Sequence, residues 1–285
     1  MIDCGGAPGQ RIAIVGVGLM GGSIGLALRA ANPNIEILGV DRADVIEAAV
    51  NRGAIHQGFS QPADCIPSSD TVVIAVPVHA VCGAIRSIAP FVSAAATVTD
   101  IASVKSSIAA FGNELLGERF IAGHPMAGSE QTGVQNARED LFNDAAWALT
   151  PITQDSVRLE HLEALLRSTG ARPIRLNPST HDRIAALVSH LPHLLSFAYN
   201  RCIEADPEAE LAHRMGGGSY RDFTRVAASD PTLWRDVFLE NKDWLLAALQ
   251  AHREAISSLE AAVLTADPDT VMQSILTAAA THKSA

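Results

Sequence analysis

Three glycines near the N-terminus have the spacing of a nucleotide-binding loop. Gly16, Gly18 and Gly21 follow the pattern G-x-G-x-x-G. An apolar run, residues 11–15, precedes them and a helix-favouring run, residues 23–31, follows. In such a strand–turn–helix unit the first glycine allows the tight turn, the second lets a pyrophosphate approach the backbone, and the third lets helix and strand pack closely. The phosphates would bind free N–H groups at the helix N-terminus, so the pattern predicts a dinucleotide site.

An acidic residue indicates which dinucleotide would bind. Residues 35–40 are typical of a second buried strand, and this strand ends in Asp41. A carboxylate at that place accepts hydrogen bonds from both hydroxyls of an adenosine ribose and repels a 2′-phosphate. Arg42, the next residue, could turn towards such a phosphate. We therefore expect NAD as the cofactor, with NADP less favoured.

A histidine and a serine are candidates for the chemistry itself. His124 and Ser103 each follow a stretch that is typical of a buried strand, as does Pro77. All three would line the crevice at the carboxyl edge of a parallel sheet, beside a nicotinamide. His124 could act there as a general base with an apparent pKa of about 6–7, or be a hydrogen-bonded core residue. Ser103 could bind a substrate hydroxyl or serve as a helix N-cap.

Three further histidines, His181, His190 and His193, invite a metal hypothesis. Zinc sites need ligands at a regular spacing. Here Pro192 interrupts the closest pair, and no carboxylate joins it at ligand spacing. We expect no metal site.

Charged residues follow a run of three glycines at residues 216–218. Arg221, Asp222 and Arg225 would lie within about one helical turn of each other. They could form a solvated surface ion pair. The glycines instead favour a close backbone approach, and an arginine is a good bidentate partner for a carboxylate.

The elements that must position these residues are strands alternating with helices over residues 1–177. This pattern predicts the class α/β, with a Rossmann-type, doubly wound and mostly parallel sheet as a dinucleotide-binding domain. We expect the last two strands to extend this sheet at an edge. The expected strands cover residues 11–15, 35–40, 71–76, 97–101, 120–124, 146–149 and 172–176.

Residues 178–285 show helical patterns without strands, which predicts an all-α C-terminal domain. Residues 180–203 would form one stretch kinked at Pro192, and Asp230 and Asp267 would cap later helices. The helix after Asp230 carries an a/d-like seam, which packs either in its own chain or against a second copy. The seam comprises Phe238, Leu245, Leu249, His252, Ile256, Leu259 and Val263.

Composition narrows the class of protein. The 285 residues are 48% hydrophobic and carry a formal net charge of −10. This charge argues against nucleic acid or an anionic membrane as a partner, so an anionic substrate would need its own local cations. Four widely separated cysteines, Cys4, Cys65, Cys82 and Cys202, form no C-x-x-C pair. With no signal peptide or membrane span evident, we expect a cytoplasmic protein.

Five segments together resemble the prephenate/arogenate (cyclohexadienyl) dehydrogenase family of tyrosine biosynthesis: residues 16–23, 100–105, 123–130, 189–193 and 216–234. The resemblance implies an NAD-dependent enzyme that converts prephenate to 4-hydroxyphenylpyruvate by oxidative decarboxylation. A hydride leaves the ring carbon that bears the hydroxyl, carbon dioxide is lost, and the ring becomes aromatic. The alternative is arogenate, which gives tyrosine, or both substrates, and no residue decides between them.

The resemblance also implies roles for residues that would take part in the chemistry. His124 matches the catalytic histidine that contacts the ring hydroxyl, and Ser103 matches its hydrogen-bonding partner. His190 matches a second active-site histidine.

Other matched residues would hold the substrate carboxylate. Arg225 matches the arginine that binds it, with Asp222 and Glu130 in the surrounding ionic network. Trp234 matches an aromatic residue that the partner subunit brings to the site. The helical domain of the family makes a homodimer, which favours the seam as an interface.

Two other classes remain as alternatives. A 3-hydroxyacid dehydrogenase would rely on a lysine in the helical domain, where this chain offers histidines and Arg225. A redox-sensing binding protein would need an effector element, and no basic helix-turn-helix is evident.

Overall fold

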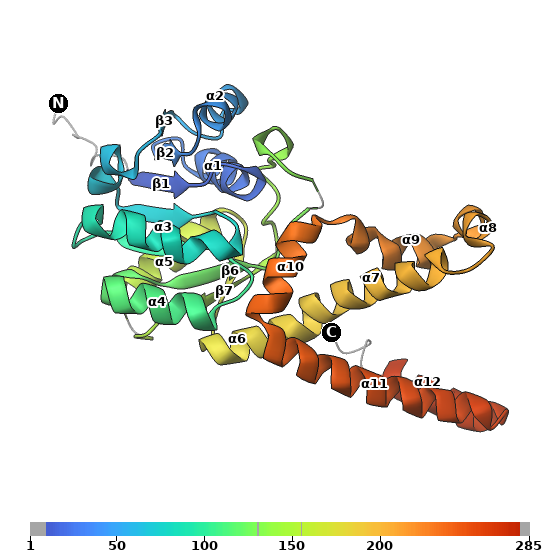
Figure 1. Ribbon diagram of the computed structural model, residues 1–285. Coiled ribbons are helices and arrows are strands. Elements are labelled where there is room, and N and C mark those ends of the chain that lie inside the picture. Colours follow the sequence, from blue (N-terminus) through green and yellow to red (C-terminus); the bar gives the residue numbers. More distant parts are fainter. Residues whose placement is uncertain (1–9, 130, 155, 280–285) are drawn as a thin grey trace, which may run out of the picture.

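The computed structural model describes residues 10–129, 131–154 and 156–279 (Figure 1). A sheet-containing part, up to about residue 175, meets a helical part that begins at Pro178. Among the helices of the described residues, none has both the length and the apolar character needed to cross a bilayer.

Five parallel strands form the first sheet, in the order β3-β2-β1-β4-β5. Their near-continuous burial matches the apolar runs expected of a sheet that is covered on both faces. The short edge strand β3 was not expected from the sequence. The strands are β1 (Arg11–Val15), β2 (Glu36–Val40), β3 (Gln57–Phe59), β4 (Thr71–Ile74) and β5 (Thr97–Asp100).

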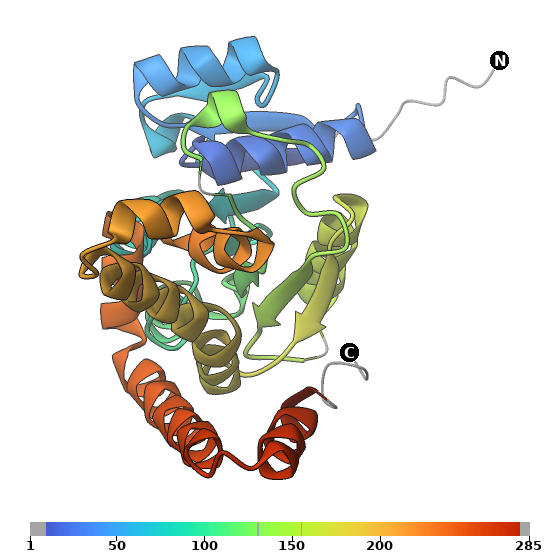
Figure 2. The same ribbon diagram turned by 90° about the vertical axis from the view of Figure 1, so that its right-hand side faces the viewer.

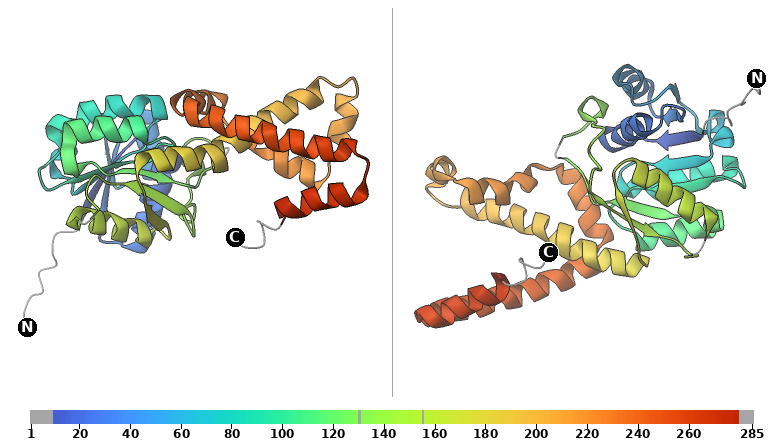
Figure 3. Two further views of the ribbon diagram at one scale, coloured as in Figure 1. Left: turned by 90° about the horizontal axis from the view of Figure 1, so that it is seen from below. Right: turned by 180° about the vertical axis from the view of Figure 1, so that it is seen from behind.

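Helices cover both faces of this sheet (Figures 1 and 3). Ile12 and Ile14 of β1 pack into the core under α1, α2 and α5, whereas Ala13 and Val15 face the core under α3 and α4. The helices are α1 (Leu19–Ala31), α2 (Ala43–Arg52), α3 (Val81–Ile88), α4 (Ser106–Leu116) and α5 (Val157–Ser168). Short 3₁₀ turns occur at Pro62–Asp64, Ile66–Ser68, Val78–Ala80, Ala89–Phe91, Gly117–Arg119, Val134–Asn136 and Val226–Ala228.

The last three strands form a sheet of their own, so the expected edge extension is wrong. β6 (Ala122–Pro125) pairs antiparallel with β7 (Ala146–Thr150), which pairs parallel with β8 (Arg172–Arg175). A single bridge, Val98–Phe120, links the two sheets. Beyond this bridge the Gly123 N–H donates to the Asp100 carboxylate, 3.1 Å away. This N–H is therefore not available for a backbone hydrogen bond that would continue the pairing between the two sheets.

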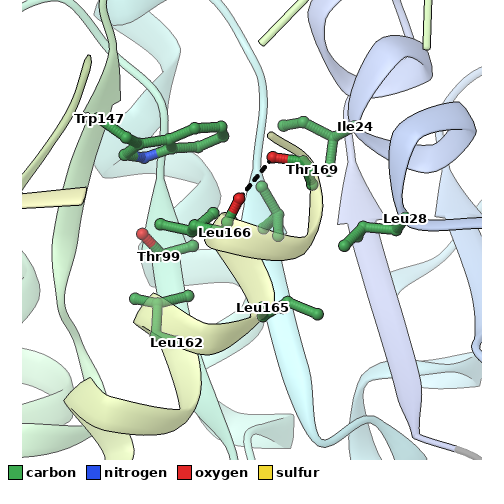
Figure 4. A pocket seen from close by; sticks show the side chains of 9 residues that line it. Ile24, Leu28, Thr99, Trp147, Leu162, Leu165, Leu166 and Thr169 are labelled. Carbon is green, nitrogen blue, oxygen red and sulfur yellow. Dashed lines mark hydrogen bonds between the residues drawn. The ribbon is translucent and has the colours of Figure 1, made fainter. Parts of the chain in front are cut away.

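A small hollow between α1, α5 and the two sheets is part of the core. Figure 4 shows Ile24 and Leu28 of α1 opposite Leu162, Leu165 and Leu166 of α5, with Trp147 and Thr99 closing it. The Thr169 hydroxyl on its rim donates 2.7 Å to the Leu166 carbonyl. With a mainly apolar lining and this hydroxyl already paired, the hollow offers little to a polar ligand.

The helical part begins with α6 (Pro178–Ala185), a π-helical turn (Ala186–His190) and α7 (Leu191–Glu204). The irregularity expected at Pro192 thus takes the form of a π turn just before it, because a proline in the first turn of α7 has no N–H to donate. Further helices are α8 (Ala209–Met215), α9 (Gly218–Arg225), α10 (Pro231–Glu240), α11 (Lys242–Leu264) and α12 (Pro268–Ala279). α11 and α12 form a hairpin that points away from the first sheet (Figures 1, 2 and 3).

The caps expected at Asp230 and Asp267 are confirmed, since their carboxylates accept the N–H groups of Thr232 and Thr270. The prediction of a single long helix after Asp230 is wrong, because the helix is interrupted at Asn241, between α10 and α11.

This break leaves Phe238 on α10 and the other residues of the expected seam on α11, where burial differs along the helix. Leu245 is buried against α7 and the π turn, whereas Ile256, Leu259 and Val263 are 49%, 43% and 64% exposed. The start of α11 therefore packs within its own chain, whereas its later turns offer an apolar surface.

Candidate active site

The glycine loop has the geometry that its spacing predicts. Gly16 has φ +92°, and a Cβ there would lie 2.6 Å from the Ala75 carbonyl oxygen. A Cβ on Gly21 would overlap the Gly16 carbonyl oxygen, so helix and strand touch at this point. Gly18 differs, because no described atom lies within 4 Å of a Cβ built on it. It is also the N-cap of α1, where no side-chain cap is formed within the described chain, so open space and free N–H groups fit a pyrophosphate.

Asp41 lies at the end of β2 and faces this loop. Its carboxylate accepts the Val17 N–H and the Arg42 N–H, both at 2.8 Å. The exposed Arg42 side chain pairs with Asp44 at 3.3 Å. Pro77 follows β4, is exposed, and begins the turn Val78–Ala80 that contacts α10.

Ser103 is not the N-cap of the following helix, so that reading is wrong. α4 begins at Ser106, and its N-terminus is capped from the helical part of the chain. The Asp182 carboxylate accepts the Lys105 N–H at 2.7 Å and the Ser106 N–H at 2.8 Å. Ser103 is left half-buried in the loop between β5 and α4, with its carbonyl facing His190.

His124 lies on β6, only 7% exposed, at the junction of the sheet and helical parts. Its Nδ1 is 2.8 Å from His181 Nε2, and His181 Nδ1 is 2.8 Å from Asp182 Oδ1. Burial, together with neighbouring His181 and Lys105, lowers the pKa of His124 well below its usual value of 6.5. The free protein thus keeps this imidazole neutral at a lower pH than the expected pKa of about 6–7 implied.

A fully buried ion pair supports the strand at this point. Lys105 Nζ bonds to the Asp100 carboxylate and donates to the Gly123 carbonyl at 2.7 Å. The other carboxylate oxygen of Asp100 accepts the Gly123 N–H. The ion pair therefore binds both the backbone N–H and the backbone carbonyl of Gly123, the residue before His124.

His190 is completely buried at the end of the π turn. Its Nδ1 lies 3.0 Å from the Asn241 side-chain amide, which also donates 2.8 Å to the Asp182 backbone carbonyl. Burial, followed by the neighbouring His181, lowers the pKa of His190 to about 4. No well-formed hydrogen bond to Nε2 exists among the described residues, although the Ser103 carbonyl faces this ring.

Trp234 of α10 lies against histidines of its own chain. Its ring stacks on His193 with centroids 3.6 Å apart and meets His190 edge-on at 6.2 Å. It is 7% exposed. The expectation that a partner subunit supplies this residue to the site stays a prediction.

The charged residues of α9 are exposed. The Arg221 side chain donates 3.0 Å to the Gly216 carbonyl, and no side-chain hydrogen bond or ion pair of Asp222 or Arg225 occurs within the described chain. Arg225 is close enough to His193 to help burial lower the pKa of that histidine. Glu130 lies outside the described residues.

Sequence reasoning missed part of this cluster. The sequence predicts no role for His181 beyond a possible metal ligand, and it indicates no role for Lys105, Asp182 or Asn241. Asp182 carried a signal, since it stands three and four positions before buried Ala185 and Ala186 and thus on the apolar face of α6. In the described residues no group of three His, Cys, Asp or Glu side chains could hold a metal ion.

Comparison with known proteins decides the family. Residues 24–175 match the sequence model of the prephenate dehydrogenase nucleotide-binding domain, and residues 177–277 match that of the prephenate dehydrogenase dimerization domain. The chain belongs to the prephenate dehydrogenase family. It is 34% identical over 243 residues to prephenate dehydrogenase of Bacillus subtilis, covering 83% of this chain and 66% of that protein. It is 30% identical over 271 residues to cyclohexadienyl dehydrogenase of Zymomonas mobilis, covering 93% and 92%.

Solved structures of this prephenate dehydrogenase family are similar along nearly the whole chain. Prephenate dehydrogenase from A. aeolicus, in complex with hydroxyphenyl propionate and NAD+, has a TM-score of 0.89 and 32% identity and covers 96% of this chain and 98% of that one. Synechocystis arogenate dehydrogenase has a TM-score of 0.82 and 27% identity and covers 96% and 99%. The Rossmann-type first domain and the helical second domain expected from the sequence are confirmed.

Proposed function

We propose that this protein catalyses the NAD-dependent oxidative decarboxylation of prephenate to 4-hydroxyphenylpyruvate. The observation that carries the proposal is His124, which is nearly buried, contacts His181 and lies at the junction of a nucleotide-binding sheet and a helical domain. Arogenate is the second candidate substrate, because relatives include a cyclohexadienyl dehydrogenase and an arogenate dehydrogenase.

NAD is the proposed cofactor, and when bound it accepts the hydride. Gly16, Gly18 and Gly21 would hold its pyrophosphate, and Asp41 its ribose hydroxyls. Arg42 and Pro77 would border the same site. Asp41 already accepts two backbone N–H groups, so its side chain is held towards the loop.

His124 is the proposed general base. As the carbinol carbon gives up its hydride, the hydroxyl on that carbon becomes acidic, and a neutral imidazole can take the proton. Loss of the ring carboxylate as carbon dioxide then returns an electron pair to the ring, which becomes aromatic. The proton held by His124 can return to the phenolic oxygen, so no proton is gained or lost overall.

The remaining candidate residues would bind and orient the substrate. Ser103 would contact the ring hydroxyl, and His190 would lie behind it, with its buried ring facing the Ser103 carbonyl. Arg225 would bind a carboxylate of the substrate. Because the chain has a net charge of −10, an anionic substrate needs such a local cation. The proposal places Asp222, Glu130 and Trp234 around that carboxylate.

We also propose a division at Asn177–Pro178 into two domains, 1–177 and 178–285, and a homodimer formed by the second. The exposed apolar residues Ile256, Leu259 and Val263 of α11 support the dimer. The cytoplasm is the proposed location, supported by the free thiols of Cys65, Cys82 and Cys202.

Turnover assays test the function directly. Prephenate and arogenate are each supplied with NAD or NADP, and reduced cofactor is followed by absorbance. We expect the highest kcat/KM with prephenate and NAD. Turnover of arogenate but not of prephenate would make arogenate the substrate. Equal kcat/KM values with NAD and NADP would contradict the role of Asp41. No turnover of either substrate would overturn the proposal.

A further inference from the structure

A chain of hydrogen bonds runs from the base into the protein interior. His124 contacts His181, and His181 contacts Asp182, with both contacts at 2.8 Å. His181 and Asp182 are 2% and 4% exposed, so water does not compete for these bonds. The described chain offers His124 Nε2 no hydrogen-bond partner, and this nitrogen is not among the fully buried ones.

The direction of each bond follows from Asp182. Its carboxylate already accepts the N–H groups of Lys105 and Ser106 and can only accept. Nδ1 of His181 must therefore carry the hydrogen that faces Asp182. In a neutral ring this leaves Nε2 of His181 as an acceptor, so Nδ1 of His124 must donate to it.

The ring of His190 has the opposite tautomer, with its hydrogen on Nε2. The Asn241 amide nitrogen faces the Asp182 carbonyl at 2.8 Å, and a flipped amide would set two oxygens against each other. The second hydrogen of that amide is therefore directed at His190 Nδ1, 3.0 Å away. A neutral His190 then carries its hydrogen on Nε2.

We propose that Asp182 sets the tautomers of both active-site histidines in opposite senses. Its carboxylate, through His181, makes His124 present a bare Nε2 as the base. Its backbone carbonyl, through Asn241, makes His190 present an N–H as a donor. Asp182, His181 and Asn241 are positioning residues. The proposal deepens the proposed function, since it gives His124 the tautomer that general-base catalysis requires.

The arrangement matters because a neutral imidazole can carry its hydrogen on either nitrogen. A His124 with the hydrogen on Nε2 would offer a donor where the reaction needs an acceptor. In the serine-protease triad, a carboxylate-to-amide change that imposes the wrong tautomer lowers kcat by about 10⁴. The buried pair His181–Asp182 would serve the same purpose here with one more ring in the chain.

The direct test reads the tautomer in the free protein, without turnover. Histidine labelled with ¹⁵N is incorporated, and long-range ¹H–¹⁵N spectra at neutral pH separate protonated from bare ring nitrogens. Comparison with His124→Asn and His190→Asn spectra assigns the two rings. We expect a protonated Nδ1 and bare Nε2 for His124, and the reverse for His190. A protonated Nε2 on His124, or a bare one on His190, would overturn the proposal.

Variants at His181 test the consequence for catalysis. His181→Leu removes the acceptor, so His124 should shift towards the Nε2-protonated form and kcat should fall roughly 30-fold or more, with KM changed less than about threefold. His181→Gln keeps an acceptor oxygen for His124 and should recover most of the kcat. The exposed His161 of α5 supplies the control His161→Leu, which should match the wild type.

The outcomes separate this proposal from the function. A folded His181→Leu protein with wild-type kcat and an unchanged His124 tautomer would overturn the role of His181. If that variant fails to fold, the wild-type spectrum alone decides the tautomers. If the protein turns over neither prephenate nor arogenate while the spectra agree, the proposed function fails and the tautomer assignment stands.

Discussion

The two sides of the candidate site differ in how completely the chain holds its own polar groups. On the inner side, His124, His181, Asp182 and Lys105 are less than a tenth exposed and are joined by hydrogen bonds. On the outer side, α9 carries Arg221, Asp222 and Arg225 in exposed positions.

This difference matches the chemistry proposed for each side. Proton transfer needs donors and acceptors that are already oriented, because reorganisation at the moment of reaction raises the barrier. Binding of a carboxylate can instead use a mobile cation that becomes ordered with the ligand. We therefore expect changes on the inner side to alter kcat or stability, and changes on the outer side to alter KM.

The largest effect is expected at His124. His124→Asn keeps a polar side chain of similar shape but removes the base, so kcat should fall by ~10²–10⁴. NAD affinity, measured by fluorescence quenching or calorimetry, should stay within about twofold because the glycine loop is untouched. Wild-type kcat in this variant would remove the catalytic role of the inner side and make His190 the next candidate.

Lys105 should show how strongly the inner side depends on its buried ion pair. Lys105→Met leaves the Asp100 carboxylate buried without its cation and should lower the free energy of unfolding by ~3–5 kcal/mol. Denaturant titration measures this loss. The exposed pair Arg138–Asp140 supplies the control, since Arg138→Met should cost less than about 1 kcal/mol. An equal loss in the free energy of unfolding in Lys105→Met and Arg138→Met would contradict the expected dependence of the inner side on its buried ion pair.

Arg225 should behave in the opposite way. Arg225→Ala should raise the KM for prephenate at least about tenfold while kcat and the melting temperature change little. Steady-state kinetics measures KM and kcat, and thermal unfolding measures the melting temperature. The neighbouring Arg221→Ala is the matched control, and a larger KM effect there would transfer the carboxylate contact to Arg221.

The smallest effect on activity concerns pH. Because burial lowers the pKa of His124 and sets that of His190 to about 4, both rings stay neutral well below the usual 6.5. Between pH 7.5 and 6, kcat/KM should therefore fall less than about twofold. An acid limb with its midpoint at 6.5 or above would contradict the buried placement of His124.

The same shift has a consequence for stability, with the sign fixed by the unfolded state. Below pH 6.5 the unfolded chain binds protons that these folded histidines do not, so stability is full above that pH and declines as pH falls towards 4. For His190 the loss is at most roughly 3 kcal/mol. Denaturant titrations at pH 7 and pH 5 check it.

Local sequence determined much of the first domain and the starts of two helices in the second. A turn at Gly16 and a close approach at Gly21 depend on neighbours in the same strand–turn–helix unit, and spacing alone reports them. The caps at Asp230 and Asp267 are equally local, because each carboxylate binds an N–H two or three residues away. These features need no knowledge of the rest of the chain.

Only the tertiary structure decided how the reacting side chains are held. Asp182 caps α4 from 76 and 77 positions away, and His124 meets His181 across 57 positions. Such contacts depend on how two domains dock, which no local pattern encodes. The same docking buries His124 and His190 and lowers their pKa values, whereas the sequence could suggest only the ordinary value of an imidazole.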